Sequence, residues 1–375
     1  MKKIIVILIV FLFASCQNNK RASLIIDKNI SLKVEDDFSD SPMCLNYNSN
    51  LNAISYLTFN FLNRKTEIHC FDKKTLKLSK KYSLDSLLGY ETPIHGYEIL
   101  EDNKIFLSGL MNTEAYISDK NFRVEDKFSL NYEDSIRNIS IYNFVPRSTG
   151  PVLLKNNNLY FSPRLNSIKR EDFYNKNIFY SYNINSNRYN DLIKFYFPGE
   201  YIKSNFFSHE YSSCFNENEI IISPINSHDI WIYNIDNNKY RKVEAKSDNF
   251  RKFKNYSEKQ KTMQENLYDY CAFSLYTNII YDKYRKVYYR VFLPGTDIDL
   301  NDKNLSFERE NPKKIAILIF DDKFNKIGEN LFDNYSFLAN FFVAPDGLYV
   351  NSNNKGSKKF KEGFLNFTKL NLNYD

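Results

Sequence analysis

The sequence has little of several residues on which catalytic and nucleotide-binding motifs depend. Its 375 residues include only 10 glycines, 10 prolines, four histidines and one tryptophan. No phosphate-binding glycine loop, no Gly-x-Ser-x-Gly motif and no Cys-His-Asn arrangement is found, so the motifs neither show nor exclude catalysis. No two histidines have the spacing of zinc ligands, which argues against a zinc site, and no cofactor is predicted.

The chain also lacks a large excess of charge of one sign. Its formal net charge is +6, and removing Lys2 and Lys3 with an N-terminal leader lowers this by two, to +4. So small an excess over so large a surface does not indicate nucleic-acid binding. We therefore expect no nucleic-acid partner.

Aromatic residues, by contrast, are abundant. The chain has 32 Phe and 29 Tyr, and its shares of 43% hydrophobic and 26% charged residues are those of a globular protein. Aromatic side chains favour the half-buried surfaces of β-sheets. From Ala22 onward, short apolar runs alternate with polar turns and almost no helical period is present. These features predict an all-β fold.

The first residues have the features of an export signal. Two lysines precede the apolar run Ile4 to Phe13, which is too short to span a membrane permanently, and Cys16 follows two small residues. This pattern resembles the lipobox of bacterial lipoproteins, with plain secretion and a coincidental cysteine as the alternative. We expect residues 1–15 to be a signal peptide, residues 16–23 the lipidated cysteine and a tether, and residues 24–375 a single domain.

Lipidation of Cys16 makes a membrane the first expected partner. Each buried methylene of a lipid chain contributes about 0.8 kcal/mol, so a diacyl anchor with an added N-acyl chain would hold the protein firmly. In lipoproteins of the Gram-negative type, Asp at the second mature position often favours retention in the inner membrane. Here that residue is Gln17. The resemblance therefore implies a lipid-anchored protein of the cell envelope, in the outer membrane, on a side that the sequence does not determine.

Short strand-like runs recur along the chain in units of similar layout. The stretch Asn103 to Leu130 contains three such runs separated by polar turns. The second strands of successive units lie roughly 50 to 65 residues apart, which is typical of four-stranded propeller blades with variable loops. We therefore predict a six-bladed β-propeller of four-stranded antiparallel blades, with a pair of long β-sandwiches as the alternative. The second strands contain Ser55, Ile105, Tyr160, Ile221, Tyr288 and Tyr349.

Individual strands follow from apolar alternation and bounding turns. Predicted strands include Ala53 to Asn60 in the first unit and Val287 to Leu293 in the fifth. The fourth strand of the third unit is expected at Leu192 to Phe197, and the first strand of the fifth unit at Cys271 to Tyr281.

The ring is expected to close through the N-terminal strand. The sixth unit ends without a fourth strand, whereas Leu24 to Val34 is an alternating segment without a partner. Placing this segment at the outer edge of the sixth blade removes two open sheet edges at once. An irregularity is expected near Lys28 and Asn29, where the alternation slips. The packed face would consist of Leu24, Ile26, Ile30, Leu32 and Val34.

The leader and the blade spacing together resemble the uncharacterised propeller lipoproteins of the Bacteroidetes type, which are related in architecture to the periplasmic translocation propellers. The resemblance covers the mature chain and rests on this pattern. No WD dipeptide, no kelch double glycine and no Ser-x-Asp-x-Gly-x-Thr-Trp box occurs. The resemblance implies a six-bladed propeller anchored in the envelope and implies no particular ligand.

One face of the predicted propeller gathers basic and titratable residues. The loops between blades and the loops from second to third strand share this face, on which ligands usually bind. Three of the four histidines fall there, which predicts a ligand site, with ordinary solvated loops as the alternative. The candidate ligand-binding residues are His95, Arg147, Arg164, His209, His228 and Asp229.

The loop after Leu293 carries oxygen-bearing side chains at the positions of an EF-hand-like calcium loop. Asp302 occupies the position that requires glycine, and flanking helices are not predicted, so a polar insertion is the alternative. The candidate calcium ligands are Asp297, Asp299, Asn301 and Glu308.

One segment, Lys246 to Tyr270, is a helix candidate, with Ser257 as its N-cap. It is interpreted as a helix between two blades, and a lid or docking surface is the alternative. Four cysteines remain after Cys16, and export would permit disulfides between them. All four fall inside predicted strands, so we expect buried free thiols. They are Cys44, Cys70, Cys214 and Cys271.

The anchor and the architecture together favour a binding or scaffolding module for an envelope protein or a glycan. The alternative is a hydrolase or lyase acting on glycans or peptides, which would need two carboxylates, or a histidine with a carboxylate, in the axial mouth. A third class is a purely structural partner of another envelope complex, which would present a flat apolar patch on the side of a blade.

Overall fold

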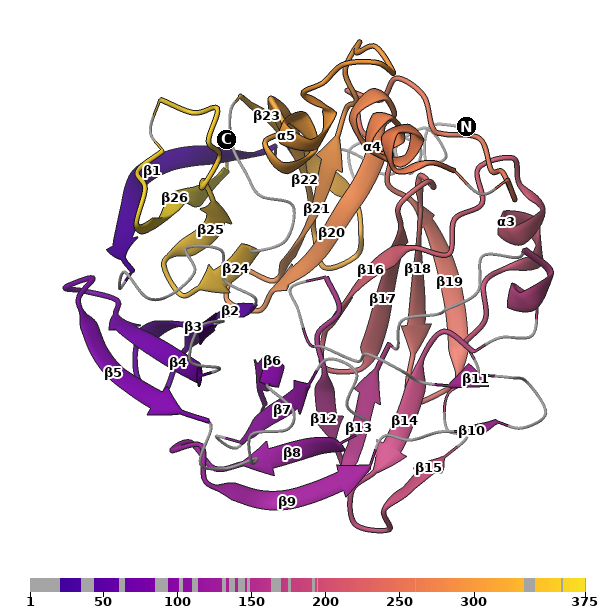
Figure 1. Cartoon of the computed structure of the whole chain (residues 1–375). Coiled ribbons are helices and arrows are strands. Elements are labelled where there is room, and N and C mark those ends of the chain that lie inside the picture. The colour runs from indigo at the N-terminus through magenta and orange to yellow at the C-terminus, as the bar shows by residue number, and fades with distance from the viewer. Residues whose placement is uncertain are drawn as a thin grey trace, which may run out of the picture.

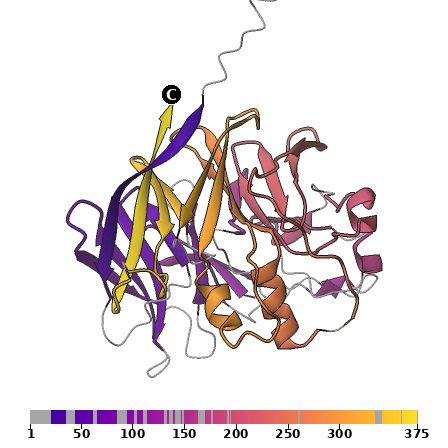
Figure 2. The same cartoon turned by 90° about the horizontal axis from the view of Figure 1, so that it is seen from above.

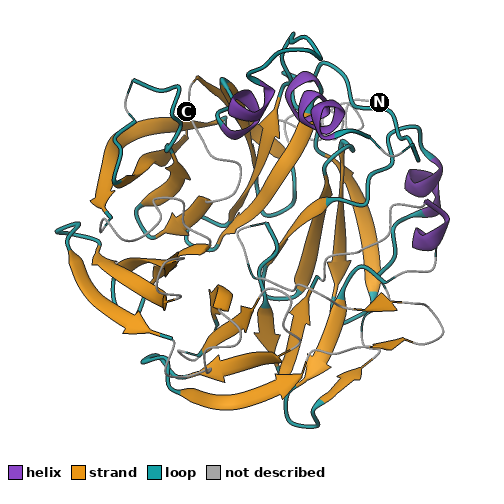
Figure 3. Ribbon diagram, viewed as in Figure 1, coloured by secondary structure: helices purple, strands orange, loops and turns teal. Residues whose placement is uncertain are grey.

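In the computed structural model, six four-stranded antiparallel sheets form a ring around a central axis (Figure 1). The chain is therefore a six-bladed β-propeller, as predicted, and not a pair of sandwiches. Strands dominate, and short helices lie at the edge of the ring (Figure 3). The structure describes residues 21–34, 44–60, 65–84, 94–100, 104–109, 114–129, 133–134, 139–140, 146, 149–162, 170–174, 177–190, 193, 195–259, 261–333, 341–358 and 360–374.

Blades 1 to 5 each use four strands that are consecutive in the chain, from the innermost to the outermost. Blade 1 contains β2 (Cys44–Asn48), β3 (Ala53–Asn60), β4 (Lys65–Asp72) and β5 (Leu78–Ser83). Blade 2 contains β6 (Ile94–Ile99), β7 (Ile105–Gly109), β8 (Glu114–Ser118) and β9 (Val124–Ser129). Blade 3 contains β12 (Leu153–Lys155), β13 (Asn158–Phe161), β14 (Tyr180–Asn183) and β15 (Arg188–Asn190). Blade 4 contains β16 (Tyr211–Phe215), β17 (Glu219–Pro224), β18 (Asp229–Asn234) and β19 (Lys239–Glu244). Blade 5 contains β20 (Leu275–Asp282), β21 (Val287–Leu293), β22 (Lys314–Phe320) and β23 (Lys326–Asp333).

Blade 6 joins the two ends of the chain. Its inner strands are β24 (Phe341–Ala344), β25 (Gly347–Asn351) and β26 (Phe364–Tyr374), and its outer strand is β1 (Ala22–Lys33). The predicted closure by the N-terminal strand is therefore confirmed. A separate pair, β10 (Glu133–Asp134) with β11 (Ile139–Ser140), lies outside the blades.

The register of β1 contains the predicted irregularity, at a shift between Ile26 and Lys28. Leu24, Ile30 and Leu32 are buried, but they do not share one face as predicted: Leu24 packs with residues of blade 5, whereas Ile30 and Leu32 pack with residues of blade 1. The shift accounts for this difference, because one extra residue reverses the side to which the following side chains point. Ile26, which the alternation predicts to be packed, is 41% exposed.

Each interface between neighbouring blades has its own apolar cluster, and aromatic side chains fill much of the space in these interfaces. Between blades 3 and 4, the ring of the buried Trp231 lies 4.9 Å from that of Tyr201 and 5.8 Å from that of Phe197, measured between centroids. Such edge-to-face pairs contribute about 0.5–1.5 kcal/mol each beyond area burial. The sequence predicts the fourth strand of blade 3 at residues 192–197, but that strand is β15. Apolar residues of the predicted run pack into the cluster between blades 3 and 4 instead, and this is why the run resembles a strand in composition.

The helices are short and occupy connections between strands. They are the 3-10 helix η2 (Arg170–Phe173), α3 (Gly199–Lys203), α4 (Met263–Ala272) and α5 (Leu305–Glu310). No helix in the described ranges is long and apolar enough to cross a bilayer.

The predicted helix starts later than expected. Thr262, not Ser257, caps α4, and the Glu265 side chain accepts a hydrogen bond from the Thr262 backbone to complete a capping box. Cys271 therefore lies in α4 and not in the first strand of blade 5, which starts at Leu275. All four described cysteines are buried and free, as expected.

The two ends of the ring differ, and we name them by their loops. The turn face carries the turns from first to second strand and from third to fourth strand, and the connection face carries the other loops. Strand β1 begins and β26 ends on the turn face, whereas α4 and α5 lie on the opposite side (Figure 2).

Candidate functional site

The inner strands of all six blades surround an axial cavity of about 430 Å³. This volume lies in the range of small-molecule sites, roughly 300 to 1,000 Å³. The lining includes Ser49 and Asn50 of the β2–β3 turn and Lys283 and Tyr284 of the β20–β21 turn. These turns lie on the turn face, so the mouth of the axial cavity opens there.

Glu98 is the one carboxylate among the described residues that line the axial cavity. It is half-buried on β6, opposite Phe106 of β7, and its neighbour Tyr97 packs between blades 1 and 2. Burial raises the pKa of the Glu98 carboxyl to about 8, and the positive charge of Lys283 opposes this rise. At neutral pH the group is therefore mainly a neutral acid, which can donate a hydrogen bond.

Lys283 reaches the same cavity from blade 5, three blades from Glu98 and hence across the axis. Its ammonium group lies 5.6 Å from the centre of the Tyr284 ring. Neither Glu98 nor Lys283 has a side-chain hydrogen bond or an ion pair with another residue in the part of the chain that the structure describes. The cavity thus presents a cation and a neutral acid that the described residues leave free for a ligand.

Amide and phenol groups complete the polar lining. The Asn46 amide donates to the Tyr97 carbonyl oxygen at 3.3 Å, and the Tyr47 hydroxyl donates to the Asn52 side chain at 3.0 Å. The ammonium group of Lys73 lies 5.0 Å from the Tyr47 ring centre. These contacts fix the side chains around the mouth before any ligand arrives.

The residues predicted from sequence lie elsewhere. Arg147 and Arg164 fall outside the described residues, as do Cys16 and residues 1–15, which are predicted to be a signal peptide. His95 is half-buried in β6, within the register shift between Ile94 and Gly96, and is not among the residues that line the axial cavity. His209 lines a second cavity on the connection face, where its ring stacks on Phe173 at 5.7 Å.

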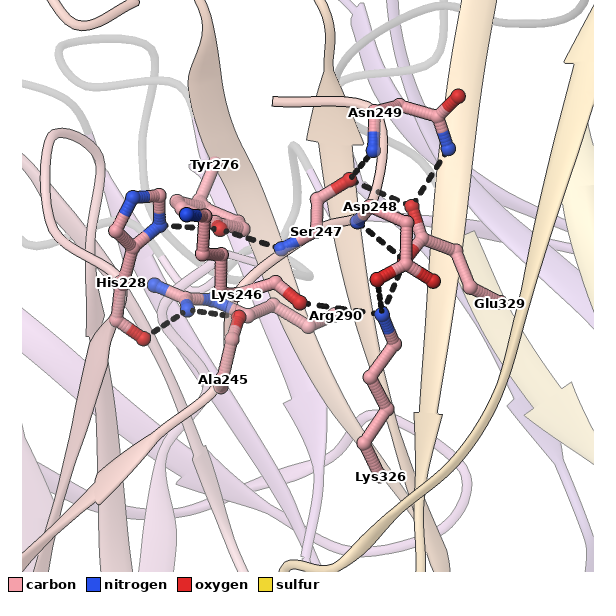
Figure 4. Close-up of polar contacts among 10 residues, drawn as sticks. All are labelled: His228, Ala245, Lys246, Ser247, Asp248, Asn249, Tyr276, Arg290, Lys326 and Glu329. Atoms are coloured by element: carbon pink, nitrogen blue, oxygen red, sulfur yellow. Dashed lines mark hydrogen bonds and ion pairs between the residues drawn. The ribbon is translucent and has the colours of Figure 1, made fainter. Parts of the chain in front are cut away.

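The side chain of His228, near that second cavity, is held by contacts within the protein. Its Nδ1 atom lies 3.0 Å from the Tyr276 hydroxyl (Figure 4). Its ring packs against Phe250 and Phe253. Burial, with the nearby charges of Arg290 and Lys246, lowers the pKa of His228 to about 4. The imidazole is therefore neutral at pH 7. Asp229, the next residue, pairs with Lys242 on the adjacent strand at 3.5 Å.

Arg290, which the sequence reasoning missed, holds this loop in place. It is fully buried on β21 and donates to the carbonyl oxygens of His228 at 2.8 Å and Ala245 at 2.9 Å (Figure 4). It also donates to the carbonyl oxygen of Ser227 at 2.7 Å. Its guanidinium also lies 3.4 Å from the Tyr276 ring centre. An arginine inside the apolar strand VYYRVFL was the available signal, because a buried charge requires partners.

The calcium loop does not gather its four candidate ligands. Asp297 pairs with Arg251 at 2.6 Å, and Glu308 pairs with Lys313 at 3.0 Å. Asp299 accepts a hydrogen bond from a backbone amide at 2.7 Å, that of Asn301. Among the described residues, no group of three or more His, Cys, Asp or Glu side chains could hold a metal ion. Calcium binding by this loop gains no support from the geometry.

Comparisons with known proteins agree with the fold. A family model described as Domain of unknown function (DUF4221) matches residues 23–331. The crystal structure of a DUF4221 family member from Bacteroides vulgatus has a TM-score of 0.75 at 17% identity, covering 95% of this chain and 99% of that chain. A protein from Bacteroides fragilis that is described as exported has a TM-score of 0.50 at 9% identity, covering 94% of this chain and 95% of that chain. No curated protein matches.

Proposed function

The chain belongs to the family described as Domain of unknown function (DUF4221), and from its own geometry we propose that it is an envelope-anchored module that binds a small anionic molecule in the axial cavity. The predicted membership of an uncharacterised Bacteroidetes propeller family is confirmed by this match and by the Bacteroides vulgatus structure. The family description assigns no activity, so the proposal rests on the site.

The observation that carries the proposal is the pair of side chains left without partners in the axial cavity. Lys283 attracts an anion, and Glu98 in its neutral form donates a hydrogen bond to it instead of repelling it. A carboxylate or phosphate held between them would satisfy both groups. The preformed walls limit the loss of side-chain freedom on binding.

The anchor supports an orientation for this site. Cys16 precedes the start of β1, at Ala22, by six positions, which span at most about 20 Å when fully extended. Since β1 starts on the turn face, lipidation of Cys16 would hold the mouth of the axial cavity toward the membrane surface. The leader and Gln17 favour the outer membrane on the lipoprotein resemblance. Replacing Cys16 with Ser tests the anchor: the variant should move from the membrane fraction to the soluble fraction, and equal retention would contradict lipidation.

The lining favours binding over the hydrolase or lyase alternative. Hydrolysis of glycosides usually requires two carboxylates that flank the bond to be cleaved. In the described lining of the axial cavity, Glu98 stands alone, and the four described histidines are not among the lining residues. A carboxyl opposite a lysine is suited to recognition of an anion.

Calorimetric titration of the full chain in detergent with succinate and with inorganic phosphate tests the proposal. At pH 7, we expect at least one of these probes to bind, and uncharged succinamide to bind at least tenfold more weakly than succinate if succinate is the ligand accepted. Lys283→Met should weaken binding of the accepted anion at least tenfold, because it removes the cation.

Lys323→Met is a matched control, since Lys323 is an exposed lysine in another turn of blade 5 on the same face. Its affinity for the probe should equal that of the parent. The proposal is wrong if neither anion binds, or if Lys283→Met binds as tightly as Lys323→Met.

A further inference from the structure

A second cavity of about 490 Å³ lies on the connection face, between blades 4 and 5. Its walls come from the segment before β16, the β17–β18 loop, the long connection before α4, and α4 itself. These elements lie on the opposite side of the ring from the mouth of the axial cavity. The two cavities are therefore separate sites.

The charges around the second cavity cancel. Three lysines and three carboxylates line it among the described residues. Asp269 is bound by Lys254 at 2.8 Å and by Lys261 at 2.7 Å. The hydroxyl of Tyr270 donates to Glu210 at 2.9 Å, and that of Tyr256 donates to Glu258 at 3.1 Å. All three carboxylates and two of the three lysines are already engaged within the chain, and the charges that line the cavity balance, so the cavity is suited to an uncharged ligand.

Unused amide groups point to a ligand rich in hydroxyls. Asn226 is only 9% exposed, lines the cavity, and has no side-chain hydrogen bond within the described ranges. Asn255 and Asn266 line the same cavity, and their side chains also lack a hydrogen-bond partner in the described part of the chain. An amide offers a donor and an acceptor side by side, which matches adjacent hydroxyl groups.

Two tyrosine rings supply the apolar part of the site. The guanidinium of Arg170 lies 4.1 Å from the ring centre of Tyr256, and that of Arg309 lies 5.0 Å from the ring centre of Tyr270. With their hydroxyls bound as well, both rings are held in place. The C–H faces of sugar rings pack on aromatic rings, whereas sugar hydroxyls pair with hydrogen-bond donors and acceptors such as side-chain amides.

The connection before α4 forms one wall of the second cavity, and hydrogen bonds hold the start of this connection in place. Glu329 of β23 accepts hydrogen bonds from the Ser247 hydroxyl at 2.5 Å, the Asp248 backbone at 2.9 Å and the Asn249 amide at 2.8 Å (Figure 4). Further along, the backbone of Tyr256 donates to Asn205 at 2.7 Å. The wall is therefore preformed, which lowers the entropic cost of binding.

We propose that the second cavity is a binding site for a short neutral saccharide. The inference stands on its own cavity and does not depend on the anion site on the axis. Asn226, Asn255 and Asn266 bind the hydroxyls, and Tyr256 and Tyr270 contact the sugar rings.

The test is calorimetric titration of the full chain in detergent with cellotriose, maltotriose and N,N′-diacetylchitobiose, combined with saturation-transfer NMR on the sugar protons. We expect at least one of the three to bind. Asn226→Ala should weaken its affinity at least tenfold. Asn266→Ala, an exposed position on α4 at which loss of folding is not expected, should weaken it at least threefold.

Asn371→Ala is the matched control, because Asn371 is an exposed asparagine near the end of β26, which lies on the turn face, on the opposite side of the ring from this cavity. It should bind the saccharide as the parent does. The proposal is overturned if none of the three saccharides binds, or if both Asn226→Ala and Asn266→Ala bind like Asn371→Ala. Binding of a trigalacturonate, which is charged, in preference to all three neutral probes would also overturn it.

Discussion

Gly328 of β23 leaves no space for a side chain beside Ala22 of β1: a Cβ atom at this glycine would lie 1.9 Å from the Ala22 carbonyl oxygen. The backbone of blade 5 thus approaches the strand that closes blade 6. Nearby, the Leu24 amide donates to the Asn330 side chain at 2.8 Å. The closing strand is held by blade 5 as well as by β26.

Gly328→Ala should therefore destabilise the propeller by about 2–4 kcal/mol, because the new methyl group displaces β1. Gly199→Ala is the control, since no atom lies within 4 Å of a Cβ built there. Urea unfolding of both variants measures the difference. Equal stability of the two variants would mean that β1 adjusts to the methyl group without loss.

Removing the closing strand should have a larger effect. Leu24, Ile30, Leu32 and Val34 are buried, and each contributes about 1.5–3 kcal/mol before chain entropy is subtracted. A chain that begins at Asp36 should lose cooperative unfolding or aggregate through the open edge of β26. Thermal unfolding should be compared with that of a chain that begins at Gln17. Identical melting temperatures of the two chains would show that β1 is only a linker and does not stabilise the ring.

Arg290→Met should cost about 3–5 kcal/mol, because it leaves the carbonyl oxygens of Ser227 and Ala245 without this donor. It also removes one of the two donors to the His228 carbonyl oxygen, which the Ala245 amide reaches at 2.8 Å. Burial lowers the pKa of Arg290 to about 10, yet the group stays charged at neutral pH. Arg241→Met is the control, since the ion pair of Arg241 with Glu219, at 3.3 Å, is partly exposed. Chemical denaturation that ranks the two variants equally would contradict a role for Arg290 in joining blades 4 and 5.

The stability of the protein should depend on pH through Glu98. Burial raises its pKa from 4.5 to about 8, so between these values the folded state binds more protons than the unfolded state. The contribution of this group is fully present below about pH 4.5 and is lost as pH rises through about 8. Across this range the parent should lose free energy of unfolding on the order of 2 kcal/mol, after allowance for the partial exposure of the side chain. Glu98→Gln cannot ionise and should not show this loss. Urea unfolding from pH 5 to 9 measures this slope, and Glu125→Gln, at an exposed carboxylate, should keep it.

Local patterns predicted most of the blades because each strand is bounded by turns and alternates with period two. The predicted strands Ala53–Asn60 and Val287–Leu293 match β3 and β21 at both ends. The run at 192–197 misled because apolar residues that pack between blades resemble a strand in composition. The closing strand could be predicted because the N-terminal end of the chain has a strand without a partner and the last unit, at the C-terminal end, lacks its fourth strand.

The axial site could not be predicted in the same way. Glu98 and Lys283 are far apart in sequence and line the same cavity only because the inner strands of six blades converge on one axis. Lys283 lies in an ordinary polar turn, and nothing local distinguishes it from the lysines of other turns. Glu98 did carry a signal, as a single acidic residue in the inner strand IHGYEI. The histidines drew attention to the connection face, where His209 lines the second cavity.

The most direct test of the anion site is a ¹³C NMR titration of the Glu98 carboxyl, assigned by comparison with Glu98→Gln, with and without saturating succinate or phosphate. The free protein should give a pKa of about 8. An anion bound beside this carboxyl favours its neutral form, so the pKa should rise further when the probe is present. A Glu98 pKa that stays the same in the presence of a bound anion would show that the anion binds elsewhere, and a value near 4.5 would contradict the burial on which the site depends.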